Sequence, residues 1–182
     1  MPKVIVNDDV LNAAAGDNLL TLARRNASHI WFVCDGRGLC QTCECKVESG
    51  LESLSTPSKI ELDALTETRR KEGYRLACQT KVVGPGTVSV LTVAEEVRRK
   101  AMDMIEGKKG KSLLGHASEL AGSLTRVALD FTRSIPAVAM HAIPQVISKP
   151  PDFPGVRRYI KDSRRVFERI LRDTKKIEVA TK

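Results

Sequence analysis

The chain has 182 residues, of which 42% are apolar, and this content is enough for a packed core and argues against general disorder. Aromatic residues make up 4%, which argues against recognition of single-stranded nucleic acid by base stacking. The net charge of +8 is unevenly spread: residues 1–100 hold 14 Lys and Arg against 13 Asp and Glu, whereas residues 101–182 hold 16 against 9. This asymmetry predicts two functional units.

The N-terminal stretch MPKVIVNDDV lacks the basic and apolar regions of a secretory signal, and the chain has no run of 18 apolar residues. The best apolar stretch, residues 135–147, is interrupted by Pro136 and Pro144. We therefore expect a cytoplasmic protein without a transmembrane helix. A reducing compartment favours metal binding over disulfides as the use of the cysteines.

The N-terminal part predicts strands first and then a helix. Residues 3–8 (KVIVND) predict a short strand, and residues 10–18 continue into a second strand and a turn at Gly16 and Asp17. Asp17 is a suitable N-cap for a helix over residues 18–26. The buried side of this helix is expected to comprise Leu19, Leu20, Leu22 and Ala23.

The pattern continues with alternating strands and a helix up to residue 93. Residues 43–49 alternate and predict a strand, and residues 87–93 are β-branched and predict another. Residues 56–67 predict a helix capped by Thr56, with Pro57 at its first position. The apolar positions expected in this helix are Ile60, Leu62 and Leu65. Residues 1–93 are thus predicted to form one compact α+β domain.

The remainder of the chain differs in kind. Residues 94–111 predict a helix that ends in the basic linker KKGK. Residues 112–182 predict an α-helical, basic, amphipathic extension. Its expected segments are a helix over 112–131, a short apolar segment over 135–147, a turn-rich linker over 148–155 and a last helix over 156–177.

Four of the five cysteines lie within residues 34–45 (CDGRGLCQTCEC). The spacing is Cys34-x5-Cys40-x2-Cys43, followed by 34 residues before Cys78. Structural zinc sites usually present two close ligand pairs, whereas three thiolates from one loop and a distant fourth are typical of a plant-type [2Fe–2S] site, whose loop is one residue shorter. Thiolates suit zinc as well, so zinc remains open on ligand type alone. Spacing and compartment favour the [2Fe–2S] cluster.

The glycines of this loop agree with an anionic cluster. Gly36 and Gly38 allow a tight backbone that brings amide N–H groups close to sulfur. A [2Fe–2S] cluster with four thiolates is doubly negative when oxidised and triply negative when reduced, so such donors stabilise it.

The segments VCDGRGLCQTCECKVESGLESLS and EGYRLACQTKV resemble the [2Fe–2S] ferredoxins of the β-grasp fold, and the C-x5-C-x2-C loop is similar to the adrenodoxin-like branch. The resemblance covers about residues 1–93. It implies a mixed sheet packed on a helix, with the cluster near the surface. It also implies that the irons are ligated by Cys34, Cys40, Cys43 and Cys78. The stretches GLCQTC and RLACQT are in addition similar to the iron–sulfur proteins of the chlorosome envelope in green sulfur bacteria.

Several other residues have less specific interpretations. Cys45 is interpreted as a small buried residue, with ligand exchange with Cys43 or redox reactivity as the alternatives. Arg37 either stabilises the reduced cluster, meets an acidic partner or is simply solvated. Arg75 is expected in a structural ion pair. The three histidines, His29, His116 and His141, are too scattered for a Rieske pair. His116 and His141 are expected to be structural or interfacial, with pigment or metal ligation as the alternative.

A cluster held by four thiolates has no open position for a substrate, so we predict a one-electron carrier or redox sensor and not an enzyme. A redox partner is expected to dock at the exposed loop. The expected contact residues are Asp35, Arg37, Leu39 and Gln41.

The basic tail predicts where the carrier is held. Residues 112–182 are expected to dock on a membrane surface or a multi-subunit, photosynthetic assembly such as the chlorosome envelope. A helical domain that packs on itself and a nucleic-acid contact are the weaker alternatives, the second permitted by charge alone. A different function class also stays open, namely a structural subunit whose cluster mainly stabilises the fold.

Overall fold

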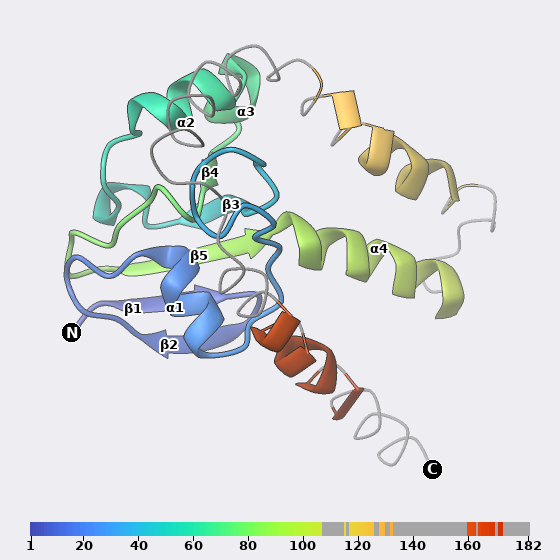
Figure 1. Ribbon diagram of the computed structural model, residues 1–182, viewed down its shortest axis with the longest axis horizontal. Helices are drawn as coiled ribbons and strands as arrows, with labels where there is room; N and C mark the ends of the chain where they lie inside the picture. Colours follow the sequence, from blue (N-terminus) through green and yellow to red (C-terminus); the bar gives the residue numbers. More distant parts are fainter. Residues whose placement is uncertain are drawn as a thin grey trace.

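The computed structural model describes residues 1–106, 115, 117–125, 128, 129, 132, 160–162, 164–169, 171 and 172. One mixed sheet has the strand order β2-β1-β5-β3-β4 (Figure 1). Its strands are β1 (Lys3–Val6), β2 (Asp9–Asn12), β3 (Glu44–Ser49), β4 (Tyr74–Leu76) and β5 (Thr87–Thr92). β1 and β5 are parallel, and the other neighbouring pairs are antiparallel.

Helix α1 (Leu19–Arg25) lies across this sheet (Figure 1). Strand β5 alternates, with Val88 and Val90 buried and Thr87 exposed, so one face of the sheet forms the core. The helix side of the core is as predicted, and its residues are Leu19, Leu20, Leu22 and Ala23. A mixed sheet grasping one main helix is the β-grasp arrangement, which confirms the expected α+β fold class.

The N-cap of α1 differs from the prediction by one residue. Asn18, not Asp17, caps the helix, because its Oδ1 accepts a hydrogen bond from the N–H of Thr21 at 3.2 Å. Asp17 is engaged one turn earlier, where its carboxylate accepts from the N–H of Ala14 and pairs with Arg25. Both residue types are good caps, and the tertiary contacts of Asn18 decide between them.

The helix predicted over residues 56–67 is two helices. α2 (Lys59–Ala64) is capped by Ser58 and not by Thr56, and it ends where Leu65 turns to an extended conformation. α3 (Glu67–Lys71) then restarts with Thr66 as its own N-cap. A 3₁₀ turn, η1 (Leu51–Ser53), and strand β4 were not predicted.

The buried side of α2 also differs from the prediction. Leu62 is 42% exposed, whereas Glu61 is fully buried. The Glu61 carboxylate accepts from the Arg75 guanidinium at 2.7 and 3.0 Å and from the backbone N–H of Leu76 at 2.8 Å. The structural ion pair predicted for Arg75 is therefore confirmed, and its partner is the residue that a polar-outside rule would place in solvent.

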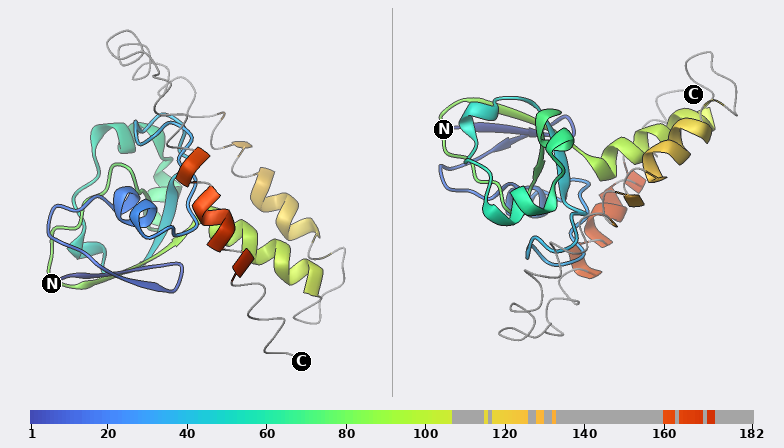
Figure 2. Two further views of the ribbon diagram at one scale, coloured as in Figure 1. Left: turned by 60° about the horizontal axis from the view of Figure 1, so that its bottom comes forward. Right: turned by 90° about the horizontal axis from the view of Figure 1, so that it is seen from above.

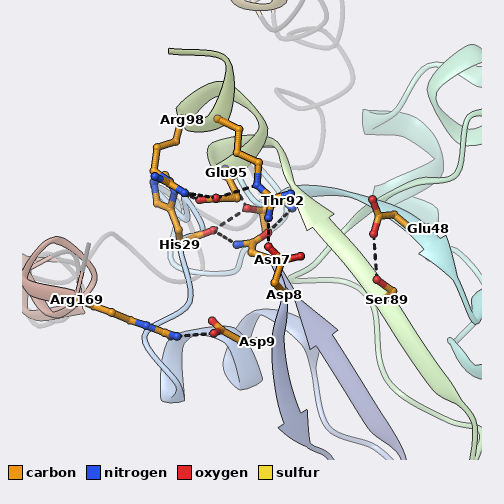
Figure 3. A network of polar contacts seen from close by, with 11 residues as sticks. Asn7, Asp8, Asp9, His29, Glu48, Ser89, Thr92, Glu95, Arg98 and Arg169 are labelled. Atoms are coloured by element: carbon orange, nitrogen blue, oxygen red, sulfur yellow. Dashed lines mark hydrogen bonds and ion pairs between the residues drawn. The ribbon is translucent and has the colours of Figure 1, made fainter. Parts of the chain in front are cut away.

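Helix α4 (Val93–Glu106) follows β5 directly, as predicted. Its first turn is fixed by Glu95, whose N–H donates to the hydroxyl of Thr92 and whose carboxylate meets His29 and Arg98 (Figure 3). Burial opposes the charge, but the hydrogen bonds from Arg98, His29 and Arg99 hold the pKa of Glu95 well below its usual range. The start of α4 is therefore anchored to the sheet domain.

Part of the predicted extension is described, and what is described there is helical. The helical residues 117–125 lie alongside α4 in both views of Figure 2, and the Lys100 ammonium donates to the Ser123 hydroxyl at 2.6 Å. The predictions that lie outside the described residues are the linker 108–111, the segments 135–147 and 148–155, and the side chains of His116 and His141. Among the described helices, none has the length and apolar character needed to cross a bilayer.

Candidate metal centre

The cysteine loop (residues 34–43) leads into β3, and four of its residues adopt the left-handed backbone conformation. Asp35, Gly36, Gly38 and Gln41 have φ values of +52°, +86°, +74° and +54°. Glycine and aspartate tolerate this region better than most residues do, so the loop composition suits the tight course of the chain. The loop curls back on itself and brings its three thiols towards one another.

Four thiols converge as two hydrogen-bonded pairs, Cys34 with Cys40 and Cys43 with Cys78. The hydrogen bond from the Cys40 thiol lowers the pKa of Cys34 to about 5, and pairing with Cys43 likewise lowers the pKa of Cys78. Within the described part of the chain, no three potential ligands surround one point as they would for a single ion. Two pairs fit a binuclear cluster, because each iron of a [2Fe–2S] centre takes two thiolates and shares two sulfides.

Hydrogen-bond donors surround these sulfurs. The Cys34 N–H donates to Cys40 Sγ at 3.3 Å, and the Thr42 hydroxyl lies 3.0 Å from the same sulfur. The Gln79 amide donates to Cys78 Sγ at 3.4 Å. Three of the four cysteines are buried, whereas Cys40 is half-buried. Donors of this kind stabilise an anionic sulfur centre and tune its potential.

The distant cysteine is held in place by the core of the domain. The N–H of Ala77 donates to the carbonyl of Cys43 at 3.1 Å, next to the β3–β4 pairing. The side-chain amide of Asn18 donates to the carbonyl of Cys78 at 2.8 Å. The residue that caps α1 therefore also positions Cys78.

Gly38→Ala is expected to destabilise the protein and to reduce cluster content. A Cβ at this position would lie 2.6 Å from Ile60 Cγ2, and the φ of +74° is strained for alanine, so the loop must shift away from α2. We expect a loss of at least about 1–2 kcal/mol in the free energy of unfolding. Urea unfolding followed by circular dichroism measures it. Gly16→Ala, which has the same kind of φ but open space, is the matched control for the contact with Ile60.

The predicted partner-contact residues are not equally available. Leu39 is half-buried, whereas Gln41 is 8% exposed, so the prediction is wrong for Gln41. Asp35 is paired with Arg24 at 2.7 Å. The Arg37 guanidinium donates to the carbonyl of Cys34 at 3.0 Å and so braces the loop.

Cys45 lies on β3 with no exposed surface, as predicted for a small buried residue. Its thiol donates to the carbonyl of Arg75 at 3.6 Å, and burial raises its pKa, which keeps it protonated. A protonated, enclosed thiol on a strand is poorly suited to ligand exchange or redox chemistry.

Sequence reasoning missed the residues that support the loop from outside it. Thr42, Gln79 and Asn18 act through side-chain contacts that no spacing encodes. Thr42 and Gln79 do stand beside cysteines in the sequence, and this adjacency was the available signal. Arg24, 11 residues before Asp35 and on α1, carried none.

Comparison with known proteins decides the family. The family model for the 2Fe-2S iron-sulfur cluster binding domain matches residues 4–83. The 2Fe-2S ferredoxin of Haemophilus influenzae is 41% identical over 91 residues, which are 45% of this chain and 80% of that protein. The chain belongs to the [2Fe–2S] ferredoxin family. This ferredoxin carries a [2Fe–2S] cluster, as its four-thiol donor set fits, and the family is one of electron carriers.

Two further relatives come from one organism, Chlorobaculum tepidum. Chlorosome protein J is 44% identical over 96 residues, which are 53% of this ferredoxin and 43% of that protein. Chlorosome protein I is 33% identical over 118 residues, which are 65% of this ferredoxin and 46% of that protein. This ferredoxin thus aligns with less than half the length of each of these two relatives, and the alignment with chlorosome protein I is the longer one.

Proposed function

We propose that this ferredoxin holds its cluster with Cys34 and Cys40 on one iron and with Cys43 and Cys78 on the other. The observation that carries the proposal is that these four thiols converge as two pairs. Hydrogen-bond donors reach a sulfur in each pair, from the Cys34 N–H to Cys40 and from the Gln79 amide to Cys78. When bound, the cluster supplies one-electron transfer and no substrate position. The protein's own part is to bury three of the thiols, donate hydrogen bonds to sulfur and leave the half-buried Cys40 as the side from which a redox partner approaches.

We further propose that the carrier is tethered by residues 112–182 to a membrane surface or assembly, in keeping with its likeness to chlorosome proteins. The described tail residues support this, because large apolar side chains stay exposed on their helices, and the helix described between residues 160 and 172 is also rich in arginine. They are Leu124, Leu129, Ile160, Phe167 and Leu171, between 46% and 60% exposed. An apolar stripe flanked by cations suits an anionic lipid surface. The chlorosome envelope is the assembly that we favour.

A midpoint potential tests the carrier role against the structural alternative. The full chain is expected to be reduced reversibly by one electron within the span of roughly −700 to +450 mV known for such centres. Spectroelectrochemistry in the visible range measures this. A cluster that cannot be cycled anywhere in that range would favour the structural-subunit alternative, in which the cluster only stabilises the fold.

Vesicle flotation tests the tether. The double variant Phe167→Ser with Leu171→Ser is expected to bind vesicles containing anionic lipid at least about tenfold more weakly than the unchanged chain. The reason is that each substitution removes an exposed apolar side chain. Leu62→Ser is the matched control, because Leu62 is 42% exposed but lies on α2. Equal flotation of all three proteins would exclude these tail side chains as the anchor.

A further inference from the structure

One guanidinium joins the cysteine loop to the end of the chain. Arg24, on α1, pairs through Nη1 with Asp35 Oδ1 at 2.7 Å. Its Nε and Nη2 reach Asp162 Oδ2 at 2.9 and 2.7 Å. The guanidinium carbon also lies 4.4 Å from the centre of the Phe32 ring. Asp35 follows Cys34 directly, so Arg24 links the cluster site to a residue more than a hundred positions away.

Other contacts seat the same segment, here named the C-terminal helix (the helical residues described between 160 and 172). Arg165 and Arg169 donate to the carbonyls of Arg25 and Asn26, at 3.3 and 3.0 Å. These carbonyls lie at the C-terminal end of α1, where helix carbonyls lack partners within the helix. Arg169 also pairs with Asp9 (Figure 3).

The C-terminal helix is two-faced. Val166 is 9% exposed, and it follows Asp162 by four residues and precedes Arg169 by three, so the docking residues share one face. Phe167, its neighbour in sequence, is 60% exposed. The helix thus rests on α1 through one side and keeps the other side free.

The docked helix carries a net positive charge, and Arg24 joins it to the cysteine loop. Residues 160–172 contain five Lys and Arg against two Asp and Glu. Reduction adds one electron and makes the cluster site more negative, and partly buried charges near it are only partly screened. A cationic helix therefore binds better beside the reduced site than beside the oxidised one.

We propose that the C-terminal helix is a redox-linked latch, docked on α1 through Arg24, Val166 and Arg169 and held more tightly when the cluster is reduced. The inference rests on the proposed ligand Cys34. Linkage requires the reverse effect as well: docking must raise the midpoint potential by the same free energy. At about fivefold tighter docking, the low end for coupled sites, the shift for one electron is about 40 mV, from 59 mV per tenfold.

The test compares two neutral substitutions at adjacent positions of the full chain. Val166→Asn places a polar side chain in the buried contact, whereas Phe167→Asn makes the same change on the exposed face. Hydrogen exchange of peptides from residues 160–172 is measured in the oxidised protein and after one-electron reduction with dithionite. We expect about fivefold slower exchange on reduction in the unchanged chain and in Phe167→Asn, and fast exchange in both states in Val166→Asn. The midpoint potential of Val166→Asn is expected to be about 40 mV lower than that of the unchanged chain, which is the fivefold factor converted at 59 mV per tenfold.

The two readouts separate the latch from the proposed function. Hydrogen exchange of residues 160–172 that does not depend on redox state would overturn the latch and leave the carrier role intact. The same conclusion would follow if only Val166→Asn showed fast exchange but both variants had the same midpoint potential. An unchanged chain whose cluster does not cycle would overturn the carrier role, and the latch with it. A normal visible spectrum in both variants shows that neither substitution acts by losing the cluster.

Discussion

Loss of any one of four thiols is expected to abolish the visible absorption of the cluster and the acid-labile sulfide of the purified protein. The four single substitutions to alanine are at Cys34, Cys40, Cys43 and Cys78. The physical reason is that one of the two irons would keep only one thiolate of its pair, and an open iron position in a partly exposed loop admits water and loses sulfide. Iron and sulfide analysis with the visible spectrum measures the effect, and cluster content should fall at least about tenfold.

Cys45→Ala is the matched control for these variants. It removes a thiol from the same stretch, but one that is enclosed on β3 and bonded to the carbonyl of Arg75. We expect full cluster content and a stability loss of about 1 kcal/mol, as for a small buried side chain. A cluster lost in Cys45→Ala, or retained in Cys78→Ala, would contradict the proposed ligand set.

Glu61→Ala is expected to cost about 3–5 kcal/mol in the free energy of unfolding. The carboxylate has no exposed surface, and its removal leaves the Arg75 guanidinium, 6% exposed, without its partner. It also removes the acceptor of the Leu76 N–H, two residues before Cys78. Urea unfolding followed by far-ultraviolet circular dichroism measures the loss. The same variant is expected to hold the cluster less well, because β4 carries Cys78 into place.

Glu67→Ala serves as the control, since the Glu67–Lys71 pair is 70% and 75% exposed. Exposed pairs of this kind contribute little, so a change within about 0.5 kcal/mol is expected. A combined Glu61→Leu and Arg75→Met protein should recover much of the loss, because the uncompensated buried charge is gone. Equal destabilisation by Glu61→Ala and Glu67→Ala would mean that the buried pair has no special role.

The four longest strands and α1 could be predicted from the sequence because their patterns are local. The N-cap of α1 could not be predicted as well. Asp17 and Asn18 are both suitable N-cap residues, and Asn18 takes this position because its side-chain amide also donates to the carbonyl of Cys78, 60 residues away. The partner-contact role predicted for Gln41 was wrong, and the burial of Glu61 was not predicted, for a similar reason. Their burial depends on partners and backbone turns that only the folded domain supplies.

The latch contacts were beyond sequence reasoning altogether. Arg24 and Asp162 are separated by 138 positions, and each alone resembles an ordinary charged residue on a helix surface. Amphipathic periodicity predicted a helix near residue 160 but not which of its faces the domain would cover. Charge balance predicted a docking tail, and the structure adds that part of the docking is to the protein itself.

The bond from Asn18 to the carbonyl of Cys78 has a consequence for biosynthesis. On the proposed ligand set, three of the ligands leave the ribosome early, but the fourth follows Cys43 only after 34 more residues. It is then positioned by the cap of a helix made near the start of the chain. On that ligand set, the four-thiol site is complete only after Cys78 has been made and has packed against the cap of α1, so cluster assembly depends on folding across at least residues 18–78.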